Sequence, residues 1–170
     1  MKVDPKDVDV IAPNLKRRFS GVTSTIVRLV PLQARDIAIA SAGPVLPDDM
    51  PRIPLGGLVT MPRQGPSGAR VWHARRNTEM LAGLALKYLL GKRLKLMFTS
   101  AAQRRHTGYT RWLIGKMDAL VATSARSASY LEHPAQVIHH GIDTQTFAPA
   151  GDRTALRQRL GLNPEAVLVG

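Results

Sequence analysis

The sequence predicts an α/β fold, with a Rossmann-like parallel sheet and helices on both of its faces. Short β-prone runs alternate with segments of helical periodicity through the first 140 of the 170 residues. Helical segments placed between successive strands favour right-handed βαβ units, in which the strands run parallel. A hydrophobic content of 44% in a chain of this length is typical of a folded domain with a buried core.

The first half of the chain predicts two strands with one helix between them. The strands are expected at residues 7–13 and 36–42, and the helix at residues 23–30. Thr23 or Ser24 would cap this helix, and Pro31 should end or kink it. Residues 43–68 are rich in proline and glycine and are expected to form mostly loop, with a short strand at residues 58–60.

The second half continues the same alternation. Strands are expected at residues 69–74, 94–99, 117–122 and 136–139, with helices at residues 77–90, 109–116 and 124–131. Asn77 and Ser124 would cap two of these helices, and Gly91 would stop the first. The predicted apolar stripe of the helix that follows Asn77 is Met80, Leu81, Leu84 and Tyr88.

The net charge of +12 is concentrated in one segment. Residues 70–116 contain eleven Lys or Arg and a single acid, Glu79. Such a segment indicates an anionic partner: nucleic acid, an acidic membrane face or a phosphorylated substrate. The chain has no cysteine, which excludes disulfides and thiolate metal sites. No apolar run is long enough to span a bilayer.

Ligands of parallel sheets bind at the carboxyl ends of the strands, so the residues that follow each strand are the candidate site. After the first strand, Ser20, Gly21 and Thr23 open a helix whose backbone N–H groups suit an anion or a sugar hydroxyl. Neither the G-x-G-x-x-G dinucleotide fingerprint nor a P-loop occurs.

Two later strand ends carry polar side chains that can bind a ligand. One holds His73, Arg75, Arg76 and Asn77, and the other holds Ser100, Arg104, Arg105 and His106. Because guanidinium groups bind carboxylate and phosphate in bidentate fashion, these arginines predict an acceptor that bears acid or phosphate groups. We expect the arginines to keep His106 neutral at physiological pH, as a hydrogen-bond acceptor or a base must be. His139 and His140 are adjacent and point to opposite faces of a strand, so no metal site is expected.

The passage from residue 137 to residue 149 has the form of a connection between two domains. It contains His140, Gly141, Asp143 and Phe147, followed by Pro149 and by a helix that ends in Leu160-Gly161-Leu162. Gly141 would adopt a positive φ in the turn. The run resembles the interdomain passage of GT-B glycosyltransferases of family 4 (group 1). The resemblance implies an acceptor-side domain at residues 1–140 and a linker at residues 141–151, with His140, Gly141, Asp143 and Phe147 as the interdomain hinge. Residues 152–170 would be the start of a truncated donor-binding domain, with its first strand at residues 166–169.

The segments around Ser20, His73 and Ser100 narrow this resemblance to lipopolysaccharide core mannosyltransferases. These retaining enzymes are implied to move mannose from GDP-mannose onto an acidic, lipid-linked saccharide, with no cofactor. Many members of the family place a histidine at the strand end that Thr99 and Ser100 occupy here, and His106 is the candidate catalytic residue of this chain. The acceptor would contact Ser20, Gly21, Thr23, His73, Arg75, Arg76, Asn77, Ser100, Arg104 and Arg105. The Glu-x7-Glu pair that holds the donor in this family is missing from the sequence. We therefore expect no transfer by these residues alone.

Two other interpretations remain open at this stage: a basic nucleic-acid-binding module, and a nucleotide-sugar-binding domain of another enzyme. The chain lacks the interleaved aromatic residues of the first and the Gly-rich dinucleotide loop of the second.

The expected location is cytoplasmic, with the protein peripheral on the inner face of the inner membrane. The basic segment would attract an anionic membrane surface there. Trp112 and Leu113 would enter the interface, and the alternative is that Trp112 packs in the core.

Overall fold

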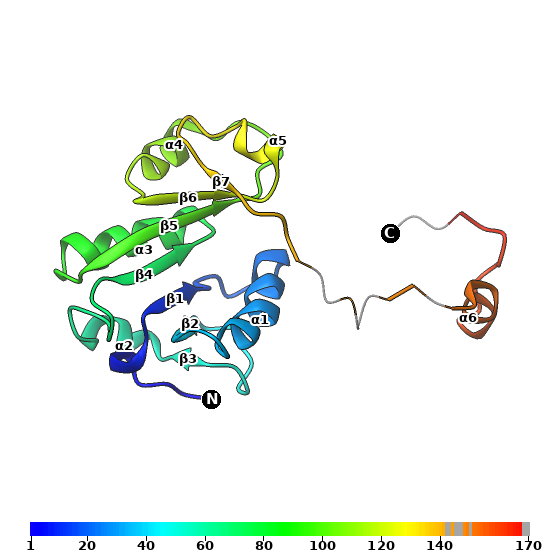
Figure 1. The fold of residues 1–170 in the computed structure, drawn as a ribbon, viewed down its shortest axis with the longest axis horizontal. Helices are drawn as coiled ribbons and strands as arrows, with labels where there is room; N and C mark the ends of the chain where they lie inside the picture. The colour runs from blue at the N-terminus through cyan, green and yellow to red at the C-terminus, as the bar shows by residue number, and fades with distance from the viewer. Residues whose placement is uncertain (142–143, 145–147, 150, 168–170) are drawn as a thin grey trace. The chain divides into compact units, whose positions relative to one another are not determined.

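We describe a computed structural model of the chain, which covers residues 1–141, 144, 148–149 and 151–167. The chain divides into two compact units, Met1–His139 and His140–Gly170. Within the described part of the first unit, seven parallel strands form one sheet in the order β3-β2-β1-β4-β5-β6-β7 (Figure 1). The predicted fold class, a Rossmann-like α/β sheet, is confirmed.

Strands and helices alternate along most of the chain, as the sequence predicts, but β2 and β3 follow one another without a helix between them, and β3 was not predicted. The strands are β1 (Val10–Pro13), β2 (Ile39–Ala42), β3 (Arg52–Ile53), β4 (Arg70–Ala74), β5 (Leu94–Ser100), β6 (Ala119–Ala122) and β7 (Gln136–Val137). The helices of this unit are α1 (Gly21–Gln33), α2 (Leu55–Thr60), α3 (Asn77–Tyr88), α4 (Gly108–Ile114) and α5 (Ala125–Ala128), preceded by a 3₁₀ turn, η1 (Pro5–Asp7).

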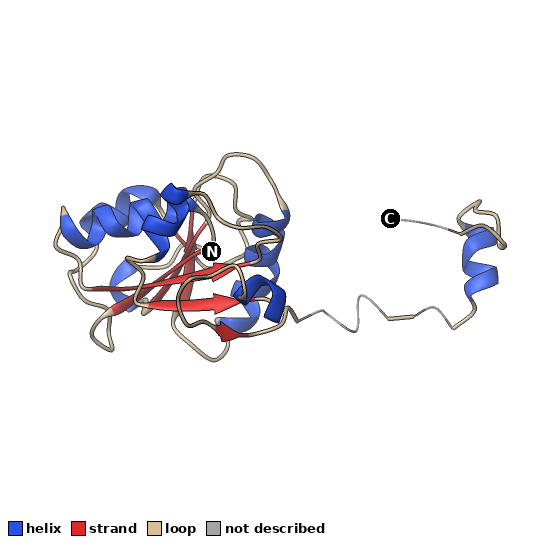
Figure 2. Cartoon of the chain, turned by 90° about the horizontal axis from the view of Figure 1, so that it is seen from above, coloured by secondary structure: helices blue, strands red, loops and turns tan. Residues whose placement is uncertain are grey.

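Helices cover both faces of the sheet (Figure 2). Because side chains alternate along a strand, Ile11 and Ala12 of β1 enter separate hydrophobic clusters. Ala12 packs with Ile26 and Val30 of α1, whereas Ile11 lies in the larger cluster with Trp72 and residues of α2 and α3. The sheet is therefore buried on both sides, as parallel sheets are.

Strand order reverses beside β1, which lies between β2 and β4. Val10 pairs with Ile39 of β2 on one side and with Val71 of β4 on the other. This reversal is the topological switch point, where loops from the two halves of a parallel sheet diverge and leave room for a ligand. The residues that follow β1 and β4 are Asn14 and Arg75.

Two predicted elements differ in type or extent. Residues 58–60 belong to helix α2 instead of a strand, and Leu58 is buried while Val59 is 55% exposed. A short apolar run fits either periodicity, and the core contact of Leu58 decides between them here. Helix α1 continues through Pro31 to Gln33, because a proline in the last turn removes only one helical hydrogen bond.

Helix boundaries also depart from the predictions. Ser20, not Thr23 or Ser24, is the N-cap of α1, and Asn77 is the first residue of α3 instead of its cap. Ser124 does cap α5, which ends earlier than predicted, at Ala128. On α3, Met80 and Leu84 are buried as expected, but Leu81 and Tyr88 are exposed. Only one side of α3 faces the sheet and α4, so the predicted stripe was too wide.

In the described part of the second unit, helix α6 (Arg153–Arg159) begins after Asp152, whose carboxylate accepts a hydrogen bond from the N–H of Ala155 at 2.9 Å. Gly161 ends this segment with a φ of 69°. Of the predicted strand at 166–169, Ala166 and Val167 are not in a strand, and the rest lies outside the described residues.

Candidate functional site

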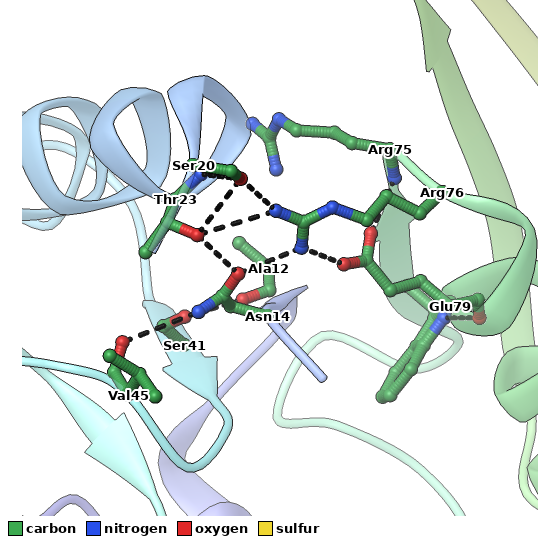
Figure 3. A network of polar contacts seen from close by, with 10 residues as sticks. Ala12, Asn14, Ser20, Thr23, Ser41, Val45, Arg75, Arg76 and Glu79 are labelled. Carbon is green, nitrogen blue, oxygen red and sulfur yellow. Dashed lines mark hydrogen bonds and ion pairs between the residues drawn. The ribbon is translucent and has the colours of Figure 1, made fainter. Parts of the chain in front are cut away.

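A polar network occupies the carboxyl edge of the sheet at the switch point. Its centre is Arg76, which follows β4 and lies at the start of α3 (Figure 3). One guanidinium nitrogen, Nη1, donates to Asn14 Oδ1 and to Glu79 Oε1, both at 2.8 Å. The other, Nη2, donates to Ser20 Oγ at 2.6 Å and to Thr23 Oγ1 at 3.3 Å. Arg76 therefore fastens the loop after β1 and the first turn of α1 to α3.

Asn14 is the second member of this network and is fully buried. Its Oδ1 also accepts a hydrogen bond from Thr23 Oγ1 at 3.0 Å, and its Nδ2 donates to the carbonyl of Val45 at 3.3 Å. A Cβ on Gly43 would lie 2.0 Å from the Asn14 carbonyl oxygen. Glycine at position 43 therefore lets the loop after β2 approach the loop after β1.

Glu79 supplies the negative charge that balances Arg76. Its carboxylate is buried, and it accepts a second hydrogen bond from the backbone N–H of Arg75 at 2.8 Å. Burial raises the pKa of Glu79, while the hydrogen bond from Arg75 and the charge of Arg76 oppose that rise. With the carboxylate 2.8 Å from a guanidinium, the charged pair is the form that satisfies both groups.

Arg75 lies next to this network but outside it. Its side chain extends toward the first turn of α1 (Figure 3). The guanidinium donates no hydrogen bond to a described residue, and its Nη1 is buried without a partner. Burial lowers the pKa of Arg75, Glu79 opposes this effect and the neighbouring Arg76 adds to it. An unmatched cation at the switch point can bind an anionic group.

His73 and Thr99 join β4 to β5 at the same edge. His73 Nε2 and Thr99 Oγ1 are 2.7 Å apart. Burial, together with the charge of Arg75, lowers the pKa of His73 to about 3. The imidazole is therefore neutral at physiological pH, and one of its nitrogens is held by the threonine hydroxyl.

His106 lies beyond β5, next to Ser100. The distance from Ser100 Oγ to His106 Nε2 is 3.3 Å, and Ser127 Oγ donates to the Ser100 carbonyl at 2.9 Å. The pKa of His106 is lowered, as expected, but the cause is burial and not the neighbouring arginines. A depression of about 560 Å³ is lined by residues 102–107 and Thr110, including Arg104, Arg105 and His106.

Asn77 connects the two halves of this edge. Its Nδ2 donates to Thr110 Oγ1 at 2.8 Å, which joins the start of α3 to α4. Thr110 Oγ1 lies 3.0 Å from Thr107 Oγ1, the hydroxyl that caps α4. Of the predicted residues, Ser20, Thr23 and Arg76 are hydrogen-bonded to one another, and Asn77 is hydrogen-bonded to Thr110. Arg104 and Arg105 are exposed. Gly21 is the first residue of α1 and is also exposed.

Two members of the network, Asn14 and Glu79, were not predicted from the sequence. A signal for each was present: Asn14 is the first polar residue after the first strand, and Glu79 is the lone acid of the basic segment, three residues after Arg76. Arg70, the first cation of the basic segment at residues 70–116, is fully buried and therefore does not contribute to the charge of the surface. In addition, Leu113 is buried, so the prediction that it enters a membrane is wrong, whereas Trp112 is 52% exposed.

Of the predicted hinge residues, His140 and Gly141 are exposed loop residues, and Asp143 and Phe147 lie outside the described residues. Gly141 does not have the positive φ expected of it. In the part of the chain that the structure describes, no cluster of three or more His, Asp or Glu side chains could hold a metal ion. No helix of that part is long and apolar enough to cross a membrane.

Comparison with known proteins adds two relatives. The chain is 52% identical over 171 residues to the lipopolysaccharide core biosynthesis mannosyltransferase LpsB of Rhizobium meliloti (strain 1021), a match that covers 99% of this chain and 48% of LpsB. It is 57% identical over 150 residues to the lipopolysaccharide core biosynthesis mannosyltransferase LpcC of Rhizobium leguminosarum bv. viciae, covering 86% of this chain and 42% of LpcC. The chain thus spans about half the length of these curated relatives. No protein-family model matches it.

Proposed function

We propose that this chain, a homologue of lipopolysaccharide core mannosyltransferases, forms the acceptor-binding half of a retaining GT-B glycosyltransferase. The transferase would move mannose from GDP-mannose onto an acidic, lipid-linked core saccharide. Support comes from the names of the two relatives and from the position of the candidate site at the switch point of a Rossmann-like sheet.

The observation that carries the acceptor assignment is the unmatched guanidinium of Arg75. Arg76, its neighbour, is neutralised by Glu79 and bonded on both terminal nitrogens. Arg75 bonds to no described residue through its side chain, although its Nη1 is buried. A carboxylate of the acceptor would supply the missing charge and two acceptor oxygens in the bidentate geometry that guanidinium favours.

The remaining predicted residues would shape the cleft around that carboxylate. We assign the acceptor-binding role to Ser20, Gly21, Thr23, His73, Arg75, Arg76, Asn77, Ser100, Arg104 and Arg105. His106, neutral and held by a long 3.3 Å contact to Ser100, would exchange that contact for a hydrogen bond to an acceptor hydroxyl and act as the catalytic group.

Donor binding is assigned to residues outside the acceptor site. Because the chain matches only about half of each relative, we propose that transfer needs the other half, and that residues 1–170 alone do not turn over GDP-mannose. In this scheme residues 1–140 form the acceptor-side domain, residues 141–151 the linker and residues 152–170 the start of the donor domain. The hinge between the domains would consist of His140, Gly141, Asp143 and Phe147. The protein would act in the cytoplasm, at the inner face of the inner membrane.

A binding titration of residues 1–170 tests the acceptor assignment. The ligands are a soluble core saccharide that carries a carboxylate and the same saccharide with that group reduced to an alcohol. We expect binding of the acid to be about 10- to 100-fold tighter, since a hydrogen bond to a charged group contributes about 1.5–3 kcal/mol. Arg75→Met should remove that preference.

Two variants serve as controls for this titration. Arg93→Met removes an exposed cation at the opposite edge of the sheet and should leave the preference unchanged. Arg76→Met should lower the free energy of unfolding by about 3–5 kcal/mol, because it leaves the Glu79 carboxylate buried and unpaired, whereas Arg75→Met should not. Equal affinity for acid and alcohol, or a preference that survives Arg75→Met, would overturn the assignment.

A further inference from the structure

A second cationic surface lies at the opposite edge of the sheet, where β4 and β5 begin. Arg63, Lys87, Lys92, Arg93 and Lys95 line a depression of about 390 Å³. The other lining residues are Ala69, Gly91 and Leu94, so no acidic side chain is among the described residues that line it. We call these five basic residues and their depression the amino-edge basic site.

The fold holds these cations in place without neutralising most of them. Arg63 Nε donates to the carbonyl of Gly91 at 3.0 Å, and Lys92 Nζ donates to the carbonyl of Met61 at 2.5 Å. These contacts fasten the loop after α2 to the turn after α3, where Gly91 has a φ of 61°. Carbonyl oxygens carry no net charge, so both cations keep their positive field.

The remaining three cations differ in their partners. Lys87 is paired with the carboxylate of Asp118 at 2.9 Å. Arg93 and Lys95 are exposed, and their side chains donate no hydrogen bond to a described residue, although the charge of Lys95 helps to lower the pKa of Asp118. The amino-edge basic site therefore presents five cations beside the carboxylate of Asp118, an excess of positive charge, with Arg93 and Lys95 as its exposed members.

An apolar tip adjoins this site at the end of α3. Tyr88, Leu89 and Leu90 are 68%, 81% and 44% exposed, respectively, and they lie in sequence between Lys87 and Lys92. Isolated exposed leucines are ordinary, but three consecutive apolar residues between cations form the pattern that interfacial membrane segments use. The cations would meet lipid phosphates while the apolar tip enters the boundary of the acyl chains.

We propose that the amino-edge basic site and the tip formed by Tyr88, Leu89 and Leu90 dock the domain onto a bilayer that contains anionic lipids. Charge complementarity selects an anionic surface, and the exposed leucines select a bilayer over nucleic acid, which would leave them in water. The docking does not depend on transferase activity.

Docking through the amino-edge basic site would also hold the acceptor site away from the bilayer. Helix α3 has 12 residues and runs from the carboxyl edge at Asn77 to the tip at Tyr88, a length of about 18 Å. On this geometry Arg75 would stand about that far from the lipid surface, so the acceptor sugar it binds would be one held away from the headgroups.

Vesicle flotation of residues 1–170 tests the proposal. The probes are vesicles of phosphatidylcholine alone and of phosphatidylcholine with roughly one-third phosphatidylglycerol. We expect binding only to the anionic vesicles, and weaker binding as sodium chloride shortens the Debye length. Arg93→Ser with Lys95→Ser should weaken binding by about 30-fold, at the attraction typical of two well-placed cations. Leu89→Ser with Leu90→Ser should weaken it at unchanged charge.

Two controls locate the surface. Trp112→Ser removes an exposed aromatic residue of α4 and should leave vesicle binding unchanged, and so should Arg75→Met, which tests the acceptor site. Equal binding to neutral and anionic vesicles would overturn the proposal. So would a loss of binding with Trp112→Ser but not with the Arg93 and Lys95 substitutions, or binding of DNA or inorganic phosphate at this site without vesicle binding.

Discussion

At the scale of single residues, Arg75 and Arg76 show that neighbours in sequence can have opposite electrostatic environments. Arg76 meets a buried carboxylate and three polar oxygens, while the side chain of Arg75 meets none among the described residues. A buried donor of a charged group is unfavourable without a partner, which makes the Nη1 atom of Arg75 a candidate for ligand binding. The same Glu79 that pairs with Arg76 accepts a hydrogen bond from the backbone N–H of Arg75, and its charge acts on the Arg75 guanidinium without a hydrogen bond between the two side chains.

His73 provides a pH prediction at this scale. Its pKa falls from 6.5 to about 3 on folding, so the folded state rejects a proton that the unfolded chain accepts. Its contribution to stability is therefore complete above pH 6.5 and is lost as the pH falls toward 3. We expect the free energy of unfolding to fall below pH 6.5, by at most about 1.4 kcal/mol per pH unit from this group.

Urea titrations at several pH values between 5 and 7 would measure this slope. His73→Asn should flatten it, because asparagine can bond to Thr99 without titrating. His133→Asn, at an exposed loop position, is the matched control and should leave the slope as it is. If the slope in the His73 variant equals that of the unmodified chain, the histidine is not the titrating group.

At the scale of elements, α3 is the helix that connects the site to the core. Trp72 of β4 is fully buried, and its indole Nε1 donates to the carbonyl of Glu79 at 2.7 Å. Gly83 faces the same ring: a Cβ there would lie 2.5 Å from Trp72 Cδ1 and 2.7 Å from Nε1. Glycine therefore sets how closely α3 approaches the sheet, and with it the position of Arg76 and Glu79.

Gly83→Ala tests this packing. Alanine would favour the helix by about 1 kcal/mol, but overpacking against a ring that cannot move should cost about 1–3 kcal/mol. We expect net destabilisation, measured by chemical unfolding. Gly56→Ala in α2, where a Cβ meets nothing within 4 Å, is the control and should stabilise by a few tenths of a kcal/mol to about 1 kcal/mol. A Gly83 variant as stable as the original chain would show that α3 can shift.

At the scale of the whole domain, Arg70 joins segments that are distant in sequence. It is fully buried at the start of β4, and its guanidinium donates to the carbonyls of Val8 at 2.7 Å, Pro5 at 2.8 Å and Gln64 at 3.0 Å. Burial lowers the pKa of Arg70, and the charge of Asp9 opposes that fall. The N-terminal turn, the loop after α2 and the centre of the sheet thus depend on one side chain.

Arg70→Met should lower the free energy of unfolding by about 3 kcal/mol or more, because several buried carbonyls lose their donor at once. Arg70→Lys keeps the charge but not the fork of donors and should recover only part of the loss. Arg93→Met, at an exposed position, should change stability by less than about 0.5 kcal/mol. Denaturant melts of the three variants would rank them, and equal midpoints would contradict this role of Arg70.

Much of the fold follows from local sequence patterns. The strands around Ile11, Trp72 and Leu96 were predictable because apolar runs with intervening helices leave few alternatives. The 58–60 segment was not, because a short run such as Leu58-Val59-Thr60 suits a strand or a helix until a core contact selects one. Helix α1 was predicted too short, since Pro31 lies inside the helix, which continues for two more residues to Gln33.

The sequence by itself determined most of the alternation of strands and helices, the parallel sheet and most of the polar residues at the strand ends, because these follow from patterns along the chain; β3, helix α2 and the role of Asn14 were not among them. Only the tertiary structure decided which cations are available. Arg70 is buried among carbonyls, Arg76 is neutralised by Glu79 and tied to Ser20, and Arg75 remains unmatched. These differences arise from contacts between segments up to 65 residues apart, which no local pattern encodes.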